Sequence, residues 1–471
     1  MSWQTIVKVN NLAVAQISFD EVFEVNRLDA EYFDPIYLEK DIILNKKKNS
    51  SIGELVEISD GNHLSITEHF IESGGVPYFR GQDVNNIFLS SANPMRIPKE
   101  IYQKSWMKRS HFKPNDILLS IVGTIGGLSF VPEDLGETSG SCKIAILRPK
   151  QTSYAKMLMV FLLGKYGQYQ LKRMTRGAVQ MGIILEDIPK IIVPDFSDKI
   201  TESINSLIIN VFDAEAKSRK QYAEAEQQFL KEINLEGYKV SDEGVSVRNF
   251  SEAIADNRFD AEYWQPKYDG IIKRVSKVSQ EKLGDIVSVK KGVEVGSEAY
   301  ADEGKDFARV SDFSIFGIEN VEKKISKELY EELKENYKPK KGEVLFTKDG
   351  TIGISFALNE DVDAIISGAF LRLKPKIKIN TTYLALVLNS FYCKTQIERL
   401  SGGAIIAHLK PDDAMGIKIP ILPEKTQEEL ASKVIEALRL RIEAKDLLEK
   451  AKRAVEIFIE KDEKTALDYL K

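Results

Sequence analysis

Two matching four-residue segments carry side chains of the kinds that hydrogen-bond to the edges of nucleic-acid bases. The first is RGQD (Arg80–Asp83), which offers a forked donor, an amide and an acceptor. The second is RVSD (Arg309–Asp312), which keeps the first and last of these residues. Arginine, glutamine and acidic side chains commonly read base edges in the major groove of DNA. An ordinary polar turn between two strands would have the same composition, so these residues alone leave both interpretations open.

A group of basic and amide side chains follows a predicted helix in the first half of the chain. The end of that helix and the next loop, KRMTRGAVQ, contain Lys172, Arg173, Arg176 and Gln180. Cations at this place suit DNA phosphates, and they equally suit the negative end of a helix dipole. The two interpretations are compatible with each other.

The sequence lacks several common catalytic and cofactor-binding motifs. It has no phosphate-binding GxxxxGK[S/T] loop and no PPY or PPF, the usual core of adenine-methylating motifs. GTIG, at 123–126 and 350–353, is too short for a dinucleotide fingerprint and predicts a tight turn. The histidines do not form a zinc-binding pair with a glutamate between them; they are His63, His69, His111 and His408. We therefore expect binding chemistry, without catalytic residues or a metal site, and we expect His408 to be a surface or DNA-facing residue.

One decapeptide occurs in each half of the chain. NRLDAEYFDP begins at Asn26 and NRFDAEYWQP at Asn257, an offset of 257 − 26 = 231 residues in a chain of 471. Further matching segments follow in the same order, and the offset drifts only to 226 at the pair ending in Pro194 and Pro420. The segments between them differ. We infer two copies of one domain that share a scaffold and have different surfaces.

Each copy begins with short strand-like runs and continues with a helical one. Apolar and β-branched runs bounded by Gly, Pro and Asp predict strands at 54–59, 116–122, 143–149, 343–348 and 370–375. A helix is predicted at 154–174 in the first copy and at 383–400 in the second. A further strand then ends at Pro194 or Pro420.

The segments after these two prolines, 197–233 and 426–461, predict long helices. Thr426 and Glu429 form the sequence pattern of a capping box. Apolar residues recur every three or four positions in both segments: Ile204, Ile208, Phe212, Ala216, Tyr222, Ala225 and Phe229, matched with Leu430, Val434, Leu438, Ile442, Leu448, Ala451 and Val455. Pairing the two stripes as a coiled coil would remove both from water. The alternative is that each helix packs on its own domain.

The bulk composition is that of a multidomain protein without a membrane-spanning segment. The chain of 471 residues exceeds one ordinary core, and no run of about 18 apolar residues occurs. Two cysteines, Cys142 and Cys393, favour a reducing cytoplasm. The net charge is −5, yet residues 101–200 carry a net charge of +6 and residues 201–260 one of −5. A basic region of this kind can bind phosphates, although chance fluctuation would also produce it.

Two divergent domains that alternate with similar long helices, each domain carrying RxxD, GTIG and GA…IP, resemble the specificity subunit of type I restriction–modification enzymes. The resemblance covers essentially the full chain, and the ordered duplication is its most specific feature. It implies an α+β fold with two pseudo-repeated β-rich target recognition domains separated by two long antiparallel coiled-coil helices. The expected boundaries are 1–195 and 236–422 for the recognition domains, and 196–235 and 423–471 for the spacer helices.

The resemblance also implies partners and their cofactors. The chain would bind double-stranded DNA at a split, asymmetric target and dock two methyltransferase (modification) subunits and the restriction (motor–nuclease) subunits. S-adenosylmethionine, ATP and Mg²⁺ would be bound by those partners, and this chain would bind no cofactor. The expected location is cytoplasmic.

We expect the DNA contacts to come from the polar residues of the matching segments. These are Arg80, Gln82, Asp83, Lys143, Lys172, Arg173, Arg176 and Gln180 in the first domain, and Arg309, Ser311, Asp312, Lys348, His408 and Lys410 in the second. The second copy has Val310 in place of Gly81 and Ile406 in place of Gln180, so readout must differ there. Two rival interpretations are a non-enzymatic coiled-coil scaffold that binds proteins and a fused restriction–methylation enzyme, which the missing methyltransferase motif opposes.

Overall fold

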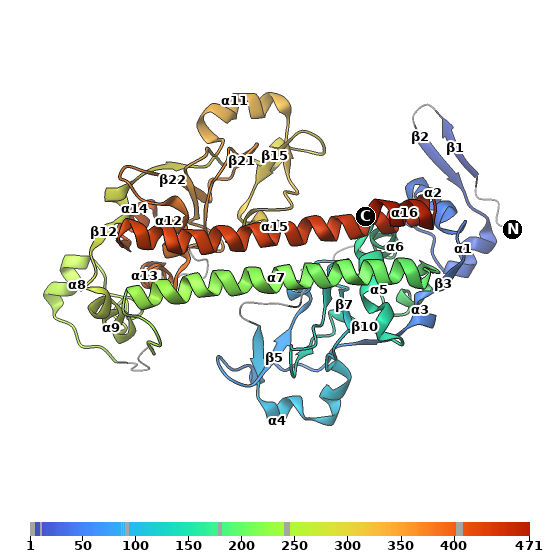
Figure 1. The fold of residues 1–471 in the computed structure, drawn as a ribbon, viewed down its shortest axis with the longest axis horizontal. Coiled ribbons are helices and arrows are strands. Elements are labelled where there is room, and N and C mark those ends of the chain that lie inside the picture. Colours follow the sequence, from blue (N-terminus) through green and yellow to red (C-terminus); the bar gives the residue numbers. More distant parts are fainter. Residues whose placement is uncertain are drawn as a thin grey trace. The chain divides into compact units, whose positions relative to one another are not determined.

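The structure is a computed structural model, and it describes residues 5–9, 12–85, 87, 89, 94–177, 181–239, 245–401 and 408–471. The chain forms two units: residues 1–213 with 443–471, and residues 214–442. It passes from one unit to the other inside two long helices, α7 (Asp198–Glu232) and α15 (Glu424–Glu460) (Figure 1). Each unit therefore contains part of both helices.

The first unit is built on a four-stranded antiparallel sheet. Its strand order is β4 (Val56–Asp60), β10 (Ile144–Pro149), β7 (Ile117–Ser120) and β8 (Leu128–Phe130). A second sheet contains β6 (Met95–Ile97), β5 (Val76–Phe79) and β9 (Ser139–Gly140). Smaller pairs are β1 (Thr5–Val9) with β2 (Leu12–Gln16), and β11 (Ile192–Pro194) with β3 (Asn49–Ser51).

The second unit repeats the main sheet with the same order and the same antiparallel pairing. Its strands are β13 (Val287–Lys291), β22 (Phe370–Pro375), β19 (Val344–Thr347) and β20 (Ser355–Ala357). The second sheet is larger here, with β14 (Tyr300–Ala301), β18 (Lys324–Ile325), β15 (Lys305–Ala308) and β21 (Ala364–Ile366). Two further pairs are β12 (Gln280–Lys282) with β23 (Lys418–Pro420), and β16 (Phe313–Ser314) with β17 (Gly317–Ile318). The predicted duplication and the predicted strands are confirmed.

Each predicted helix of the two domains is two helices. The first copy has α5 (Ala155–Leu163) and α6 (Lys165–Arg173), and the second has α12 (Thr381–Asn389) and α13 (Phe391–Ser401). The backbone is extended at Gly164 (ψ 169°) and at Ser390 (ψ 160°). A single extended residue ends the hydrogen-bond ladder of the first helix, and a second helix begins directly after it. The prediction of one continuous helix in each copy was therefore wrong.

Shorter helices complete both units. Those of the first are α1 (Phe19–Val25), α2 (Pro35–Leu44), α3 (Ile52–Leu55), α4 (Lys99–Tyr102) and α16 (Glu463–Leu470). Those of the second are α8 (Phe250–Asp256), α9 (Pro266–Val275), α10 (Leu283–Ile286), α11 (Lys327–Tyr337) and α14 (Pro411–Met415).

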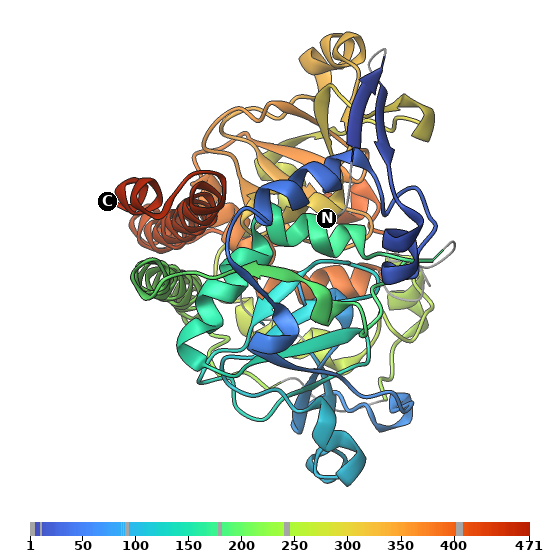
Figure 2. The ribbon, with the colours of Figure 1, turned by 90° about the vertical axis from the view of Figure 1, so that its right-hand side faces the viewer.

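Helices α7 and α15 run side by side and antiparallel within each unit (Figures 1 and 2). In the second unit the Ser218 hydroxyl donates to the carbonyl oxygen of Ala437 at 2.7 Å. In the first, the Phe196 ring, just before α7, lies 4.9 Å from the Phe458 ring of α15. Their buried positions follow a spacing of three and four, including Ile204, Ile208, Val211, Ser218, Ala225 and Phe229 on α7, and Leu430, Val434, Ala437, Ala444, Ala451 and Val455 on α15. This is coiled-coil packing, as predicted.

The predicted stripe departs from this seam in its middle. Ala216 is exposed, and the Ile442 side chain is 61% exposed. A step of four residues repeated from Ile208 drifts off a seam whose average step is 3.5, so Val211 and Ala214 are buried instead. The predicted capping box was also wrong, because α15 begins at Glu424 and Thr426 lies inside it.

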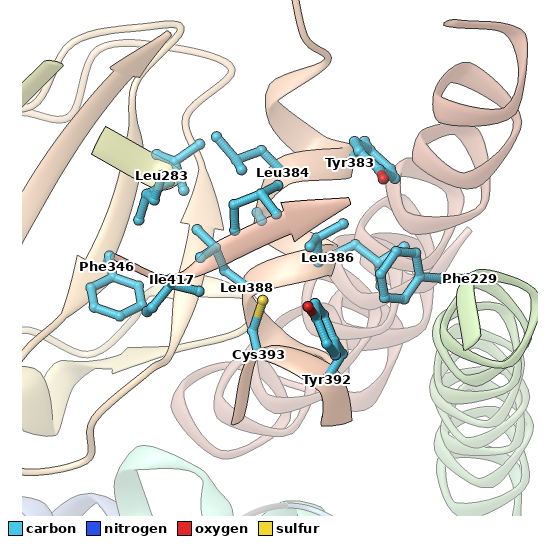
Figure 3. Close-up of a cluster of buried hydrophobic side chains, with 14 of the residues drawn as sticks. Phe229, Leu283, Phe346, Tyr383, Leu384, Leu386, Leu388, Tyr392, Cys393 and Ile417 are labelled. Carbon is cyan, nitrogen blue, oxygen red and sulfur yellow. The ribbon is translucent and has the colours of Figure 1, made fainter. Parts of the chain in front are cut away.

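The largest core of the second unit joins α7 to the sheet (Figure 3). Phe229 of α7 packs against Tyr383 of α12, with ring centroids 6.2 Å apart. The Tyr383 hydroxyl donates to the carbonyl oxygen of Pro420 at 2.7 Å, which ties α12 to the end of β23. Cys393 is fully buried in the same core, and burial raises the pKa of its thiol. Among the described helices, none is long and apolar enough to cross a membrane.

Candidate nucleic-acid interface

The RGQD segment forms a single 3-10 turn after β5, over Gly81–Asp83. The backbone N–H of Arg80 donates to Oδ2 of Asp83 at 2.8 Å, and the Arg80 Nε lies 3.5 Å from the same oxygen. Asp83 therefore shapes the turn, and its side chain is only 11% exposed. Gln82 is exposed and the Arg80 side chain is 42% exposed, so these two can reach a ligand.

The second domain builds the same turn from RVSD, over Val310–Asp312. The backbone N–H of Arg309 donates to Oδ2 of Asp312 at 2.9 Å, and the Ser311 hydroxyl donates to Oδ1 at 3.0 Å. Asp312 is buried and Ser311 is exposed. The Arg309 guanidinium also faces Glu322 at 3.3 Å. Both predicted segments are thus polar turns that leave one or two side chains open to solvent.

The GTIG segments are tight turns that pack beside these 3-10 turns. Gly123 and Gly126 have φ of 88° and 82°, a region that favours glycine, and Gly350 and Gly353 have φ of 69° and 84°. In the first domain the Thr124 hydroxyl donates to the carbonyl oxygen of Gly81 at 3.1 Å. The predicted tight turn is confirmed.

Four segments of the first domain meet at the end of β7. Ile121 donates its N–H to the carbonyl oxygen of Lys143 at 3.0 Å, and the next residue, Val122, forms an antiparallel bridge with Gly182. Gly182 also exchanges two hydrogen bonds of 2.8 Å with Arg176. The RGQD turn joins them, because a Cβ added at Gly81 would lie 3.1 Å from the carbonyl oxygen of Val122. Lys143 is exposed at this place.

The second domain repeats these contacts with other side chains. Lys348 donates its N–H to the carbonyl oxygen of Ala369 at 2.9 Å, and Asp349 forms the antiparallel bridge with His408. The Asp349 carboxylate contacts both the Lys348 Nζ and the His408 Nδ1. His408 is exposed, whereas Lys348 is mostly buried. Lys410 is exposed two residues further, just before α14.

The basic residues at the end of α6 and in the loop after it have different partners. Arg173 pairs with Asp41 and donates from Nε to the carbonyl oxygen of Tyr32 at 2.7 Å, and its side chain is only 12% exposed. Arg176 pairs with Asp187 and its side chain is 32% exposed. Lys172 is exposed. Gln180 lies outside the described residues. Arg173 is therefore used to hold the domain together.

The repeated decapeptide forms a clip on the helix that precedes the Arg176 loop. Asn26 takes the left-handed conformation (φ 53°) at the end of α1. The buried Arg27 then donates to the carbonyl oxygens of Met174 at 3.3 Å and Thr175 at 3.0 Å, past the end of α6. Its guanidinium carbon lies 4.6 Å from the centroid of the Tyr32 ring.

The second decapeptide forms the equivalent clip. Asn257 is left-handed (φ 52°), and Arg258 donates to the carbonyl oxygen of Leu400 in α13 at 3.3 Å. The guanidinium carbons of Arg258 and Arg399 lie 4.5 and 4.1 Å from the centroid of the Tyr263 ring. Hydrogen bonding to Arg258 holds the pKa of Asp260 below its ordinary value, as hydrogen bonding to Arg27 does for Asp29. In the sequence, only the repetition of the decapeptide indicated that it has a structural role. The repetition could not show which helix end the decapeptide binds.

A known domain family matches both copies. The family model described as the type I restriction modification DNA specificity domain matches residues 45–218 and 276–452. These segments make up about three quarters of the 471 residues, and the chain belongs to this family. It is accordingly a type I restriction–modification specificity subunit, as the resemblance implied.

Several solved structures are similar to the chain at low sequence identity. The S subunit of a type I restriction-modification system from M. genitalium has 16% identity over 90% of this chain and 95% of its own, with a TM-score of 0.33. The HsdS subunit from Thermoanaerobacter tengcongensis has 13% identity over 88% and 97%, with a TM-score of 0.28. A structure described as the basis of complex assembly and conformational transition of the type I R-M system has 13% identity over 88% and 98%, with a TM-score of 0.29.

Proposed function

We propose that this chain reads a bipartite, asymmetric DNA target, with one half read by each recognition domain. It docks two modification subunits and, through them, the motor–nuclease subunits. The partners bind S-adenosylmethionine, ATP and Mg²⁺, whereas this chain supplies the sequence choice and carries no catalytic residue. The two free thiols, Cys142 and Cys393, suit the reducing cytoplasm as its location.

The observation that carries this proposal is one backbone arrangement with two sets of side chains. The bridge Val122–Gly182 of the first domain corresponds to Asp349–His408 of the second. The exposed Lys143 corresponds to Ala369, because both accept a hydrogen bond from the residue before the bridge. A fixed scaffold places both sets at the same end of the sheet, while donors, acceptors and charge differ. Such a difference is what two unlike half-sites require.

The joining helices support a split target. Both α7 and α15 continue from one unit into the other, so each connection between the readers is a helix instead of a flexible linker. A stiff connection keeps the effective concentration of the second reader high at one spacing and low at others. The proposed target therefore has a fixed gap between its halves.

Adenine-methylation mapping tests the proposal directly. The chain is co-expressed with its cognate modification subunit in cells that lack this methylation, and their DNA is sequenced for modified adenines. The expected result is a motif of two unlike halves with a constant gap. Exchanging one recognition domain for that of a related subunit should change one half and keep the other. If the modification subunit is soluble and no new methylation appears, the chain is a scaffold instead of a DNA reader.

A further inference from the structure

Each unit exposes a small apolar patch at the same place in the repeat. The first patch is Phe19 and Phe23 of α1 with Leu28, whose side chains are 78%, 77% and 84% exposed. The second patch is Phe250 and Ile254 of α8 with Phe259, which are 72%, 56% and 65% exposed. Every member of the second patch lies 231 residues after its counterpart in the first.

The two patches are organised surfaces. Phe19 lies four residues before Phe23, so both point from one face of α1, and their ring centroids are 6.5 Å apart. In the second patch the rings of Phe250 and Phe259 are 6.1 Å apart. Three large apolar side chains with this exposure cost solvation free energy in the free chain. Contiguous patches of this kind mark binding surfaces.

Both short helices are held in shape although none of their described side chains is fully buried. The Ser18 hydroxyl and Glu21 form a capping box on α1, and Asn249 and Glu252 form one on α8. Each helix ends at the left-handed asparagine of the decapeptide, and the next residue is the clip arginine. The patch is thus presented on a fixed support, which lowers the entropy cost of binding.

The charge on the two helices opposes two occupants. Helix α1 contains three acidic residues and α8 contains two, and neither contains lysine or arginine. Acidic residues beside the patch repel DNA phosphates. A second copy of this chain, docked patch to patch, would set like charges against each other. The complementary surface is an apolar groove bordered by basic side chains on a different protein.

The duplication indicates one partner bound twice. The readout positions differ between the domains, as Val122 and Asp349 illustrate, whereas the patches keep position, apolar character and acidic border. Surfaces with equal chemistry bind equal partners. We propose that the α1 and α8 patches are two equivalent docking sites, each holding one copy of the modification subunit through an apolar groove with a basic border. This inference rests on the proposed function.

Paired serine substitutions and native mass spectrometry test the inference. One variant carries Phe19→Ser with Phe23→Ser, another carries Phe250→Ser with Ile254→Ser, and a third carries all four. The wild-type complex should contain two modification subunits per chain. Each paired variant should retain one, and the fourfold variant none, with unchanged circular dichroism because these side chains are exposed. Two matched controls, Ile71→Ser and Ile377→Ser, alter side chains that are 37% and 41% exposed elsewhere, and should retain two.

The outcomes separate the inference from the function on which it rests. If the fourfold variant still binds two modification subunits, the patches are not the docking sites, and the specificity role stands. If the wild-type chain binds no modification subunit, the proposed function itself fails. A charge reversal, Asp20→Lys, should weaken binding at the first patch several-fold at low salt. An unchanged affinity would reject the basic border of the groove.

Discussion

His408 and Asp349 face each other in the second domain, where the imidazole Nδ1 contacts a carboxylate oxygen and the two backbones form an antiparallel bridge. The first domain has the same bridge between Val122 and Gly182, which offer no such polar groups. The fold thus fixes the position of this bridge, whereas the side chains at the bridge differ between the two domains. Under the proposed function, point substitutions at this position would change the target sequence without disturbing the sheet beneath it.

The first prediction concerns this pair. Replacing it with the side chains of the first domain, Asp349→Val with His408→Gly, should alter the half of the target read by the second domain and leave the other half intact. The reason is that the bridge is formed by backbone groups and survives the change. Methylation mapping gives the measurement. The matched control is Val122→Ala, which alters the equivalent position in the first domain. If the double variant loosens both halves, the pair does not serve the second readout.

The second prediction concerns Lys143, an exposed cation beside the RGQD turn. If it contacts a phosphate, Lys143→Ala should weaken DNA binding about equally for all sequences and reduce the slope of log affinity against log salt by about 1. Lys150, at the other end of β10, donates to the carbonyl oxygen of Glu54 at 2.7 Å and serves as the control. The affinity of the assembled complex should be measured at several salt concentrations. A slope equal to that of the wild type would remove Lys143 from the interface.

The first two predictions alter His408 and Lys143, which the sequence nominated, and Asp349, which it did not. The structure shows why the sequence could not rank such residues. Apolar runs bounded by turn residues identified β7 and β10 because burial on both faces needs that composition. Asp83 and Arg173 also suit base or phosphate contacts by type, yet the first caps its own turn and the second pairs with Asp41. Which partner a polar side chain uses depends on residues distant in sequence. Local patterns therefore predict the strands and turns better than the tasks of the polar residues.

The third prediction compares the two decapeptide clips. Arg27→Ala should destabilise the first unit by about 2–3 kcal/mol, because a buried guanidinium bonded to several carbonyl groups is removed. Arg258→Ala should cost less, since the Arg258 side chain is 23% exposed, against 6% for Arg27. The amides of Arg176 and Gly182 should exchange hydrogen faster in the Arg27 variant. Hydrogen exchange by mass spectrometry, with thermal unfolding, provides the check, and equal losses in the two variants would contradict it.

The fourth prediction is a pH dependence that arises from Asp29. The hydrogen bond from Arg27 lowers the pKa of this carboxyl in the folded chain, so the folded state favours the ionised form. Its contribution to stability is complete above the unfolded value of about 3.9 and is lost as the pH falls through the lower folded value. Because the pair is partly exposed, the contribution is at most about 1 kcal/mol. Asp29→Asn should therefore be less stable than the wild type at pH 7, and the difference should shrink steadily as the pH falls below about 3.9. A difference that does not shrink as the pH falls below about 3.9 would assign the effect to lost packing.

The fifth prediction concerns the gap between the half-sites. Seven residues inserted after Asp213 in α7, and seven after Ile442 in α15, keep the three-and-four spacing of buried positions because they add one full heptad to each helix. Each insertion lengthens its helix by about 10 Å at 1.5 Å per residue. The gap should grow by about three base pairs at 3.4 Å each, while both half-site sequences stay the same. An insertion of four residues in α7 alone shifts its stripe against that of α15 and should abolish methylation. Methylation mapping gives the gap for the wild type, the paired insertion and the four-residue insertion. A gap that is unchanged by the paired insertion would mean that the helices do not set the spacing.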